Sequence, residues 1–257
     1  SDWSSDVCSS DLRMVIEKYF QTIDGSQIFY QIFGKETNYP LVLLHGNGND
    51  HTFFNYQISY FSKEYQVIAV DTRGHGRSTN TQSQLTFPLL AEDLAGIIQQ
   101  EHLTKINLLG FSDGANIAMV FTHLYPDFVN KLVLNSGNVT MSGLKKYVTI
   151  ATYFQYWFCR IGAFFSKKLR ARLPIVALLF EDTGLTKQDL EHIPCPTLVI
   201  TGSRDLIALS HSRAIADAIP DGKLVLVNKQ GHLFAKNSPD IFNKTIEKFL
   251  KEMKVSK

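Results

Sequence analysis

The stretch from Gly110 to Gly114 constrains this chain more than any other part of it. It reads G-x-S-x-G, follows an apolar run at residues 106–109 and precedes a run at residues 115–120 that is typical of a helix. Between a strand and a helix, this motif forms a sharp turn that exposes the serine oxygen. The two glycines allow the backbone to turn tightly enough to push Ser112 Oγ out over the end of a sheet. Because five residues can match by chance, the motif predicts a nucleophile only if the chain also supplies a base, an acid and an oxyanion hole.

Runs typical of strands and of helices alternate along the rest of the chain. Continuous apolar runs such as residues 40–44 are typical of strands that are covered on both faces. The alternation predicts an α/β fold with a mostly parallel central sheet and helices on both of its faces. The expected strands are residues 15–22, 27–33, 40–44, 65–70, 105–109, 131–134, 197–201 and 223–227, and the expected helices are residues 51–62, 89–100, 115–125, 210–219 and 239–253. Such sheets bind ligands beyond the carboxyl ends of their strands, so functional residues are expected in the loops that follow strands.

Two of these loops supply a carboxylate and a histidine. Asp205 follows the seventh expected strand, and His232 follows the eighth. A carboxylate at a strand end can hold an imidazole in one tautomer, and that imidazole can take the proton of a serine. The order Ser112, Asp205, His232 is the order that this elbow architecture requires. The loop at residues 135–138 is the other common place for the acid, and it contains no carboxylate. Its composition therefore favours Asp205.

The loop at residues 45–50 follows the third expected strand and reads HGNGND. A loop of small residues that enters a helix can present backbone N–H groups to an anion. An elbow serine needs one such donor from this loop and one from the residue after the nucleophile. We therefore predict that the oxyanion hole consists of the N–H groups of Asn47 and Asp113.

The loop at residues 71–78 reads DTRGHGRS and is predicted to be scaffold. Its glycines allow tight turns, and Asp71 and Arg73 are expected to fix the loop by pairing. His75 is predicted to be structural because His232 is better placed to act as the base.

The motifs HGNGND, DTRGHGRS, GFSDG, GSRD at residues 202–205 and GH at residues 231–232 together resemble the α/β-hydrolase superfamily over residues 15–251. The elbow and the HGNG loop are similar to those of small bacterial carboxylesterase-like members. The resemblance implies an α/β-hydrolase fold and a serine hydrolase that cleaves carboxylic esters of small to medium apolar or aromatic substrates through an acyl-enzyme. It implies no cofactor and no metal. Three alternatives stay open: a carbon–carbon bond hydrolase of vinylogous diketones, a lipid-ester lipase of the monoacylglycerol type and, least favoured, a non-catalytic receptor.

A longer segment of different composition separates the sixth and seventh expected strands, where this superfamily places a cap. The predicted domains are a core at residues 14–138 and 191–257 and a helical cap of two to four helices at residues 139–190. The segment is rich in aromatic residues, and rings that face Ser112 would form an apolar pocket. Phe111, Tyr153 and Trp157 are the candidates for contact with the substrate. The alternative is that most of these rings only pack the cap against the core.

The same segment suggests contact with a membrane surface. Residues 147–165 are nearly uncharged, and the basic side chains of Lys167, Lys168, Arg170 and Arg172 follow. This pattern resembles an interfacial element that lies on an anionic membrane. Arg160 and Gln155 interrupt the apolar run and argue against a transmembrane span. The alternative is that the basic run is an ordinary solvated helix face.

Residues 2–12, DWSSDVCSSDL, resemble the translation of a sequencing adapter. Residues 1–13 are therefore predicted to be non-native, with natural translation starting at Met14. Without them two cysteines remain, Cys159 and Cys195, and their wide spacing indicates neither a disulfide framework nor a metal site. The N-terminal residues show no signal-peptide pattern, which predicts a cytoplasmic protein. No basic cluster is interleaved with aromatic residues, so no nucleic-acid partner is expected, and the oligomeric state is not indicated.

Overall fold

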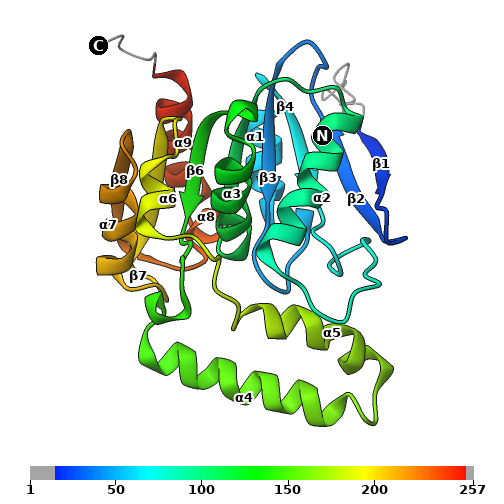
Figure 1. Cartoon of the computed structure of the whole chain (residues 1–257). Helices are drawn as coiled ribbons and strands as arrows, with labels where there is room; N and C mark the ends of the chain where they lie inside the picture. The colour runs from blue at the N-terminus through cyan, green and yellow to red at the C-terminus, as the bar shows by residue number, and fades with distance from the viewer. Residues whose placement is uncertain (1–14, 253–257) are drawn as a thin grey trace, which may run out of the picture.

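One mixed sheet forms the centre of the molecule (Figure 1). The computed structural model describes residues 15–252, so the predicted non-native segment lies outside the described residues. Within residues 15–252 the sheet has eight strands in the order β1-β2-β4-β3-β5-β6-β7-β8. The pairs β1–β2 and β2–β4 are antiparallel, and all the other neighbouring pairs are parallel. The strands are β1 (Ile16–Gln21), β2 (Gln27–Phe33), β3 (Tyr39–Leu44), β4 (Tyr65–Val70), β5 (Ile106–Phe111), β6 (Val129–Asn135), β7 (Thr197–Arg204) and β8 (Gly222–Gly231). The predicted mostly parallel sheet is thus confirmed.

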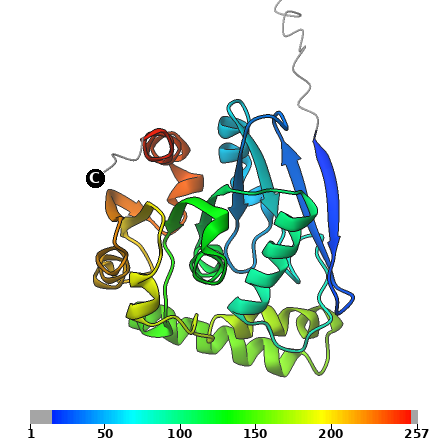
Figure 2. The ribbon, with the colours of Figure 1, turned by 45° about the horizontal axis from the view of Figure 1, so that its top comes forward.

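Helices cover both faces of the sheet, as predicted (Figures 1 and 2). The helices of the body are α1 (Asn55–Phe61), α2 (Phe87–Gln100), α3 (Asp113–Leu124), α6 (Lys187–Glu191), α7 (Leu209–Ala218), α8 (Phe234–Asn237) and α9 (Pro239–Lys251), with short 3-10 turns η1 (His51–Phe54) and η2 (Pro126–Phe128). Side chains alternate between the two faces of a strand. Val42 and Leu44 of β3 therefore join a core with α2, α3 and α7, whereas Leu41 and Leu43 join a second core with α1 and α9.

The first two expected helices differ from the helices of the structure. The helix expected at residues 51–62 is divided into η1 and α1, and the Asp50 side chain accepts a hydrogen bond from the Thr52 N–H at the start of η1. Helix α2 begins at Phe87 because Thr86 caps it and a proline occupies its first turn. A capping threonine satisfies N–H groups that have no partner inside the helix.

The last two strands are longer than expected, and this places the predicted acid and base. Strand β7 extends to Arg204 and β8 to Gly231. Asp205 and His232 therefore each follow directly on the last residue of a strand. Because β7 and β8 are parallel neighbours, both side chains start from the same edge of the sheet.

The segment between β6 and β7 is largely helical. It contains a 3-10 turn η3 (Met141–Gly143) and the helices α4 (Lys146–Gly162) and α5 (Lys167–Leu178), which lie beyond the ends of the strands at the bottom of Figure 1. Leu144 forms a β-bridge with Ile207, in the loop after Asp205. In the described part of the chain, no helix has both the length and the apolar composition needed to cross a bilayer.

Candidate active site

Ser112 occupies a strained turn between β5 and α3. Its backbone has φ 53° and ψ −120°, a conformation that non-glycine residues rarely adopt. A Cβ on Gly110 would lie 2.1 Å from the Gly114 carbonyl oxygen, and a Cβ on Gly114 would lie 2.0 Å from the Leu44 carbonyl oxygen. The neighbouring backbone therefore leaves no room for a Cβ at either position, and both residues must be glycine. The turn has the geometry that the G-x-S-x-G motif predicts.

The structure brings together the three residues that the sequence selects. His232 Nε2 lies 3.2 Å from Ser112 Oγ, and His232 Nδ1 lies 2.7 Å from Asp205 Oδ1. A carboxylate only accepts hydrogen bonds, so Nδ1 carries the imidazole proton and Nε2 can accept the proton of Ser112. The three side chains come from the ends of β5, β7 and β8. They form one continuous chain of hydrogen bonds.

Asp205 is buried and remains ionised. Burial by itself would raise the pKa of its carboxyl group, but the hydrogen bond and charge of His232, together with other donors, lower the pKa to about 2. The Ile207 N–H donates to Oδ1 at 3.1 Å. The carboxylate is therefore charged and oriented at neutral pH.

Ser136 is a further residue of the site that the sequence did not reveal. Its Oγ donates to Asp205 Oδ2 at 2.6 Å, and its backbone has a positive φ of 57°. The residue directly follows β6, where a carboxylate is absent. The only feature of the sequence that could have pointed to Ser136 is its position directly after a strand. Ser136 orients the second oxygen of Asp205.

The loop after β3 lies directly against the elbow. A Cβ on Gly46 would lie 2.9 Å from Phe111 Cε1 and 3.0 Å from Ser112 Cβ, so a larger residue there would force Phe111 or the nucleophile to shift. No hydrogen bond within residues 15–252 uses the backbone N–H of Asn47 or of Asp113. Asp113 is the first residue of α3, where an N–H has no acceptor inside the helix. Both groups are available to bind an oxyanion.

The Asn47 side chain joins three parts of the molecule. Its Nδ2 donates to Asp113 Oδ2 at 2.9 Å and to the Ile175 carbonyl of α5 at 2.7 Å. Asp113 is only 6% exposed, and burial raises the pKa of its carboxyl group to about 6, although the hydrogen bond from Asn47 opposes this. The link connects the proposed oxyanion loop to the elbow and to the insertion. Nothing in the sequence indicates this link.

The three candidates for substrate contact lie in different surroundings. Phe111 is buried, stacks on Phe53 with ring centroids 4.4 Å apart and packs against the His232 ring at 4.9 Å. Tyr153 contacts Phe180 within the insertion. Trp157 is 54% exposed on α4, and its ring contacts Tyr156 and Arg160 of the same helix. The structure gives Phe111 a packing role beside His232, and contact of the three with a substrate stays a prediction.

The predicted pair between Asp71 and Arg73 is wrong. Arg73 is buried and binds Asp93 of α2 through two hydrogen bonds of 2.6 and 2.8 Å, and it also pairs with Asp24 of the β1–β2 hairpin. The hairpin and α2 are distant in sequence, so local spacing did not reveal them. His75 is buried and its Nδ1 lies 3.1 Å from the Arg73 carbonyl, which agrees with a structural role.

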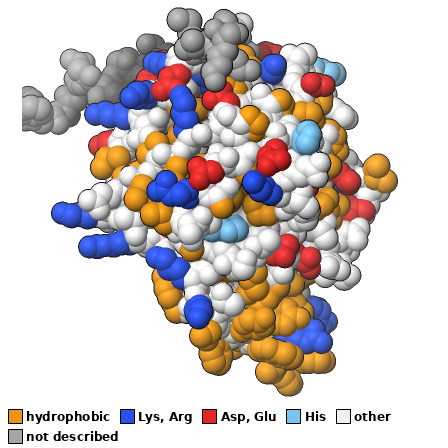
Figure 3. Space-filling view, turned by 60° about the vertical axis from the view of Figure 1, so that its left-hand side comes forward, with side chains coloured by type: hydrophobic (Ala, Val, Ile, Leu, Met, Phe, Trp, Pro, Cys, Tyr) orange, Lys and Arg blue, Asp and Glu red, His pale blue; other side chains and the backbone are white. Residues whose placement is uncertain are grey.

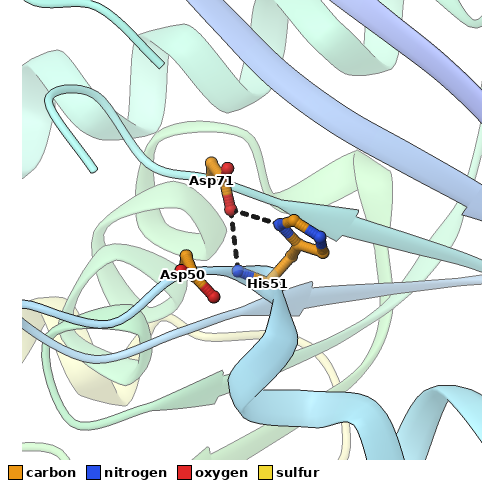
Figure 4. A group of neighbouring side chains, drawn as sticks. All are labelled: Asp50, His51 and Asp71. Carbon is orange, nitrogen blue, oxygen red and sulfur yellow. Dashed lines mark hydrogen bonds and ion pairs between the residues drawn. The ribbon is translucent and has the colours of Figure 1, made fainter. Parts of the chain in front are cut away.

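Asp71 instead joins Asp50 and His51 in a cluster whose groups could hold a metal ion (Figure 4). Asp71 Oδ1 accepts from the His51 N–H and lies 2.7 Å from His51 Nδ1, while Oδ2 accepts from the Arg77 N–H. The hydrogen bond to Asp71 raises the pKa of His51. The oxygens of Asp71 thus have partners within the protein. The cluster holds the loop after β3 against the loop after β4.

Comparison with known proteins agrees with this architecture. A family model described as alpha/beta hydrolase fold matches residues 39–185. The chain is 27% identical to a human protein named serine hydrolase BPHL, over 89% of this chain and 84% of that protein. It is 26% identical to the (E)-2-((N-methylformamido)methylene)succinate hydrolase of Acinetobacter baylyi, over 92% of this chain and 98% of that protein. The crystal structure of MGS-M2, an alpha/beta hydrolase enzyme from a deep-sea metagenome library, has a TM-score of 0.81 at 18% identity and covers 93% of this chain and 99% of its own.

Proposed function

This chain belongs to the α/β-hydrolase family, and on that premise we propose that it is a serine hydrolase that cleaves carboxylic esters. One observation carries the proposal: a half-buried elbow serine is hydrogen-bonded to a histidine, which is hydrogen-bonded to a buried carboxylate. Ser112 is the nucleophile, His232 the general base and Asp205 the residue that orients the base. The two relatives carry different hydrolase names, so the ester substrate rests on the chemistry of the site.

The first half of the reaction forms an acyl-enzyme. Ser112 Oγ attacks the carbonyl carbon of the ester as His232 Nε2 takes the hydroxyl proton. Asp205 stabilises the imidazolium ion that results. The N–H groups of Asn47 and Asp113 hold the negative oxygen of the tetrahedral intermediate, and each such donor contributes on the order of 3 kcal/mol to lowering the barrier. The imidazolium then protonates the leaving alkoxide.

The second half releases the acid. His232 removes a proton from water, the resulting hydroxide attacks the acyl carbon, and Ser112 leaves with a proton returned by His232. Every proton moves through one imidazole, so the residues present complete the cycle. That no cofactor is needed stays a prediction, as does the cytoplasmic location inferred from the sequence.

The preferred substrates are esters with small to medium apolar or aromatic groups. This preference follows from the aromatic composition of the insertion. The same nucleophile and base could serve a carbon–carbon hydrolase or a lipase, and no contact in the insertion separates them. A panel of esters of different chain length, a vinylogous diketone and a monoacylglycerol would rank these reactions by kcat/KM.

The direct test is the Ser112→Ala variant assayed with a short-chain p-nitrophenyl ester. We expect hydrolysis to fall to background, because the nucleophile is removed while the elbow keeps its backbone. Thermal unfolding of the variant should match that of the unaltered protein. Ser83→Ala, at an exposed serine before α2, is the matched control and should hydrolyse the ester normally.

Two results would contradict the assignment. Turnover of the ester by Ser112→Ala at the normal rate would remove Ser112 as the nucleophile. A normal rate in Asp205→Ala would mean that another carboxylate orients His232.

A further inference from the structure

The outward face of α4 is a continuous apolar stripe. The eight residues of the stripe recur at a spacing of three and four along the helix and its C-terminal turn, and each is between 54% and 88% exposed: Tyr147, Ile150, Phe154, Trp157, Phe158, Ile161, Phe164 and Phe165. The opposite face of α4 is the one that is buried, through Thr152 and Cys159. In Figure 3 hydrophobic side chains gather at the bottom of the molecule, where Figure 1 places α4. A soluble protein rarely exposes so large an apolar patch without a binding function.

The charged residues of the segment that carries the stripe are all positive. Residues 139–180 contain seven lysines and arginines and no aspartate or glutamate. These cations are Lys145, Lys146, Arg160, Lys167, Lys168, Arg170 and Arg172. Within residues 15–252 none of the seven forms a salt bridge with a carboxylate. The insertion therefore presents an apolar surface bordered by uncompensated positive charge.

This combination matches the surface of an anionic bilayer. Aromatic side chains enter the boundary between head groups and acyl chains, while lysines and arginines contact lipid phosphates. A second copy of the chain fits less well. A two-fold interface would place the same patch against itself and bring like charges together without a counter-charge.

We propose that the stripe on α4 docks this protein on the surface of an anionic lipid bilayer, with α4 lying in the plane of the interface. The helix has 17 residues and is thus about 25 Å long, which is shorter than the hydrocarbon core of a bilayer. It therefore lies on the membrane. The docking goes beyond ester hydrolysis and does not depend on it, so Ser112→Ala should bind vesicles as well as the unaltered protein does.

Trp157 provides a built-in reporter for the test. The chain has two tryptophans, so the Trp3→Phe variant of the full-length protein leaves only Trp157. Vesicles of phosphatidylcholine mixed with phosphatidylglycerol should shift the Trp157 emission to the blue and should sediment with the protein. Vesicles of pure phosphatidylcholine should bind at least about tenfold more weakly, because each cation near an anionic surface adds to the attraction. Raising the salt concentration should weaken the binding to anionic vesicles.

Two variants test the two parts of the surface. Phe154→Ser/Phe158→Ser removes apolar contact, and Lys167→Glu/Lys168→Glu reverses charge; each should weaken vesicle binding at least about tenfold. All four side chains are exposed, so circular dichroism and thermal unfolding should stay unchanged. The matched controls are Ile241→Ser and Lys244→Glu/Lys248→Glu on exposed positions of α9, and they should bind normally.

Three results would overturn the proposal. The first is no binding of the unaltered protein to anionic vesicles. The second is equal binding by the α4–α5 variants and the α9 controls. The third is a dimer in light scattering that the Phe154→Ser/Phe158→Ser variant abolishes, without any vesicle binding, which would assign the stripe to a second copy of the chain.

Discussion

The backbone N–H and the side-chain carboxyl group of Asp113 affect the protein in different ways. Its backbone N–H is available at the start of α3 for the proposed oxyanion hole, whereas its side chain is buried against Asn47. A buried carboxyl group with one amide donor is poorly compensated when it ionises. Position 113 is fixed by the elbow, so the residue there necessarily lies within the site. The cost of its charge should appear as a dependence of stability on pH.

We expect Asp113→Asn to stabilise the protein at pH 7.5 but not at pH 4. The folded pKa of about 6 lies above the ordinary value of 3.8, so the folded state binds the proton more tightly and stability falls as the pH rises from about 4 to about 6. The amide stays neutral and keeps an oxygen for Asn47. The gain at pH 7.5 should be about 1–3 kcal/mol, measured by urea unfolding at both pH values.

The same substitution at the exposed Asp217 of α7 is the control and should change stability little at either pH. A loss of stability in Asp113→Asn at pH 7.5 would show that the carboxylate is better compensated than its single amide partner implies.

At the scale of elements, Arg73 connects three of them. From the loop after β4 its guanidinium reaches α2 through Asp93 and the β1–β2 hairpin through Asp24. Asp93 is itself buried, and desolvation raises the pKa of its carboxyl group in spite of Arg73. Each partner of such a buried pair depends on the other for compensation of its charge. The loop after β4 therefore owes its position to a charge network as well as to its glycines.

Arg73→Met should lower the free energy of unfolding by about 3–5 kcal/mol, because Asp93 is left buried and unpaired. Chemical denaturation measures this loss. The double variant Arg73→Met/Asp93→Leu should recover part of it by removing the stranded carboxylate.

Lys251→Met is a control for the loss of an ion pair at the surface. The pairs of Lys251 with Glu64 and Glu247 lie at the surface, so the change should cost much less stability than Arg73→Met does. If Arg73→Met and Lys251→Met lower the free energy of unfolding equally, the buried ion pair contributes no more to stability than the exposed one.

At the scale of the whole molecule, the insertion is tied to two loops of the site. Its start bridges the loop after Asp205 through Leu144 and Ile207, and α5 accepts a hydrogen bond from Asn47 at the Ile175 carbonyl. Helix α4 lies outside α5 and exposes its apolar stripe (Figure 1). Segments with few buried contacts open at lower free energy than a central sheet does. The insertion should therefore be the first part of the molecule to unfold locally.

Limited digestion with trypsin should make its first cuts within residues 145–172, where seven lysines and arginines lie. Mass spectrometry of the early fragments identifies the sites. A protease that cuts after glutamate finds no site in residues 139–180 and should therefore make no early cut there. First tryptic cuts in α7 or α9 would instead place the least stable part of the molecule in the body.

The sequence by itself determined the fold class and the elbow, and it singled out Ser112, Asp205 and His232, which the folded chain brings within hydrogen-bond distance of one another. Each of these depends on local patterns: the period of apolar residues, the glycines of a tight turn and the order of polar residues after strands. The carboxyl ends of parallel strands lie at one edge of the sheet. The positions of these three residues after their strands were therefore enough to predict that their side chains meet.

Only the tertiary structure decided which polar groups pair across elements. Ser136 contacts Asp205, Asn47 contacts Asp113 and α5, and Arg73 contacts Asp93. These partners are between 20 and 128 residues apart, and no local period links them. The sequence also left open which aromatic side chains of α4 are exposed. An aromatic run can either pack against the core or face solvent, and its composition is the same in both cases. Which polar groups pair depends on burial and on distances between side chains, and both exist only in the folded chain.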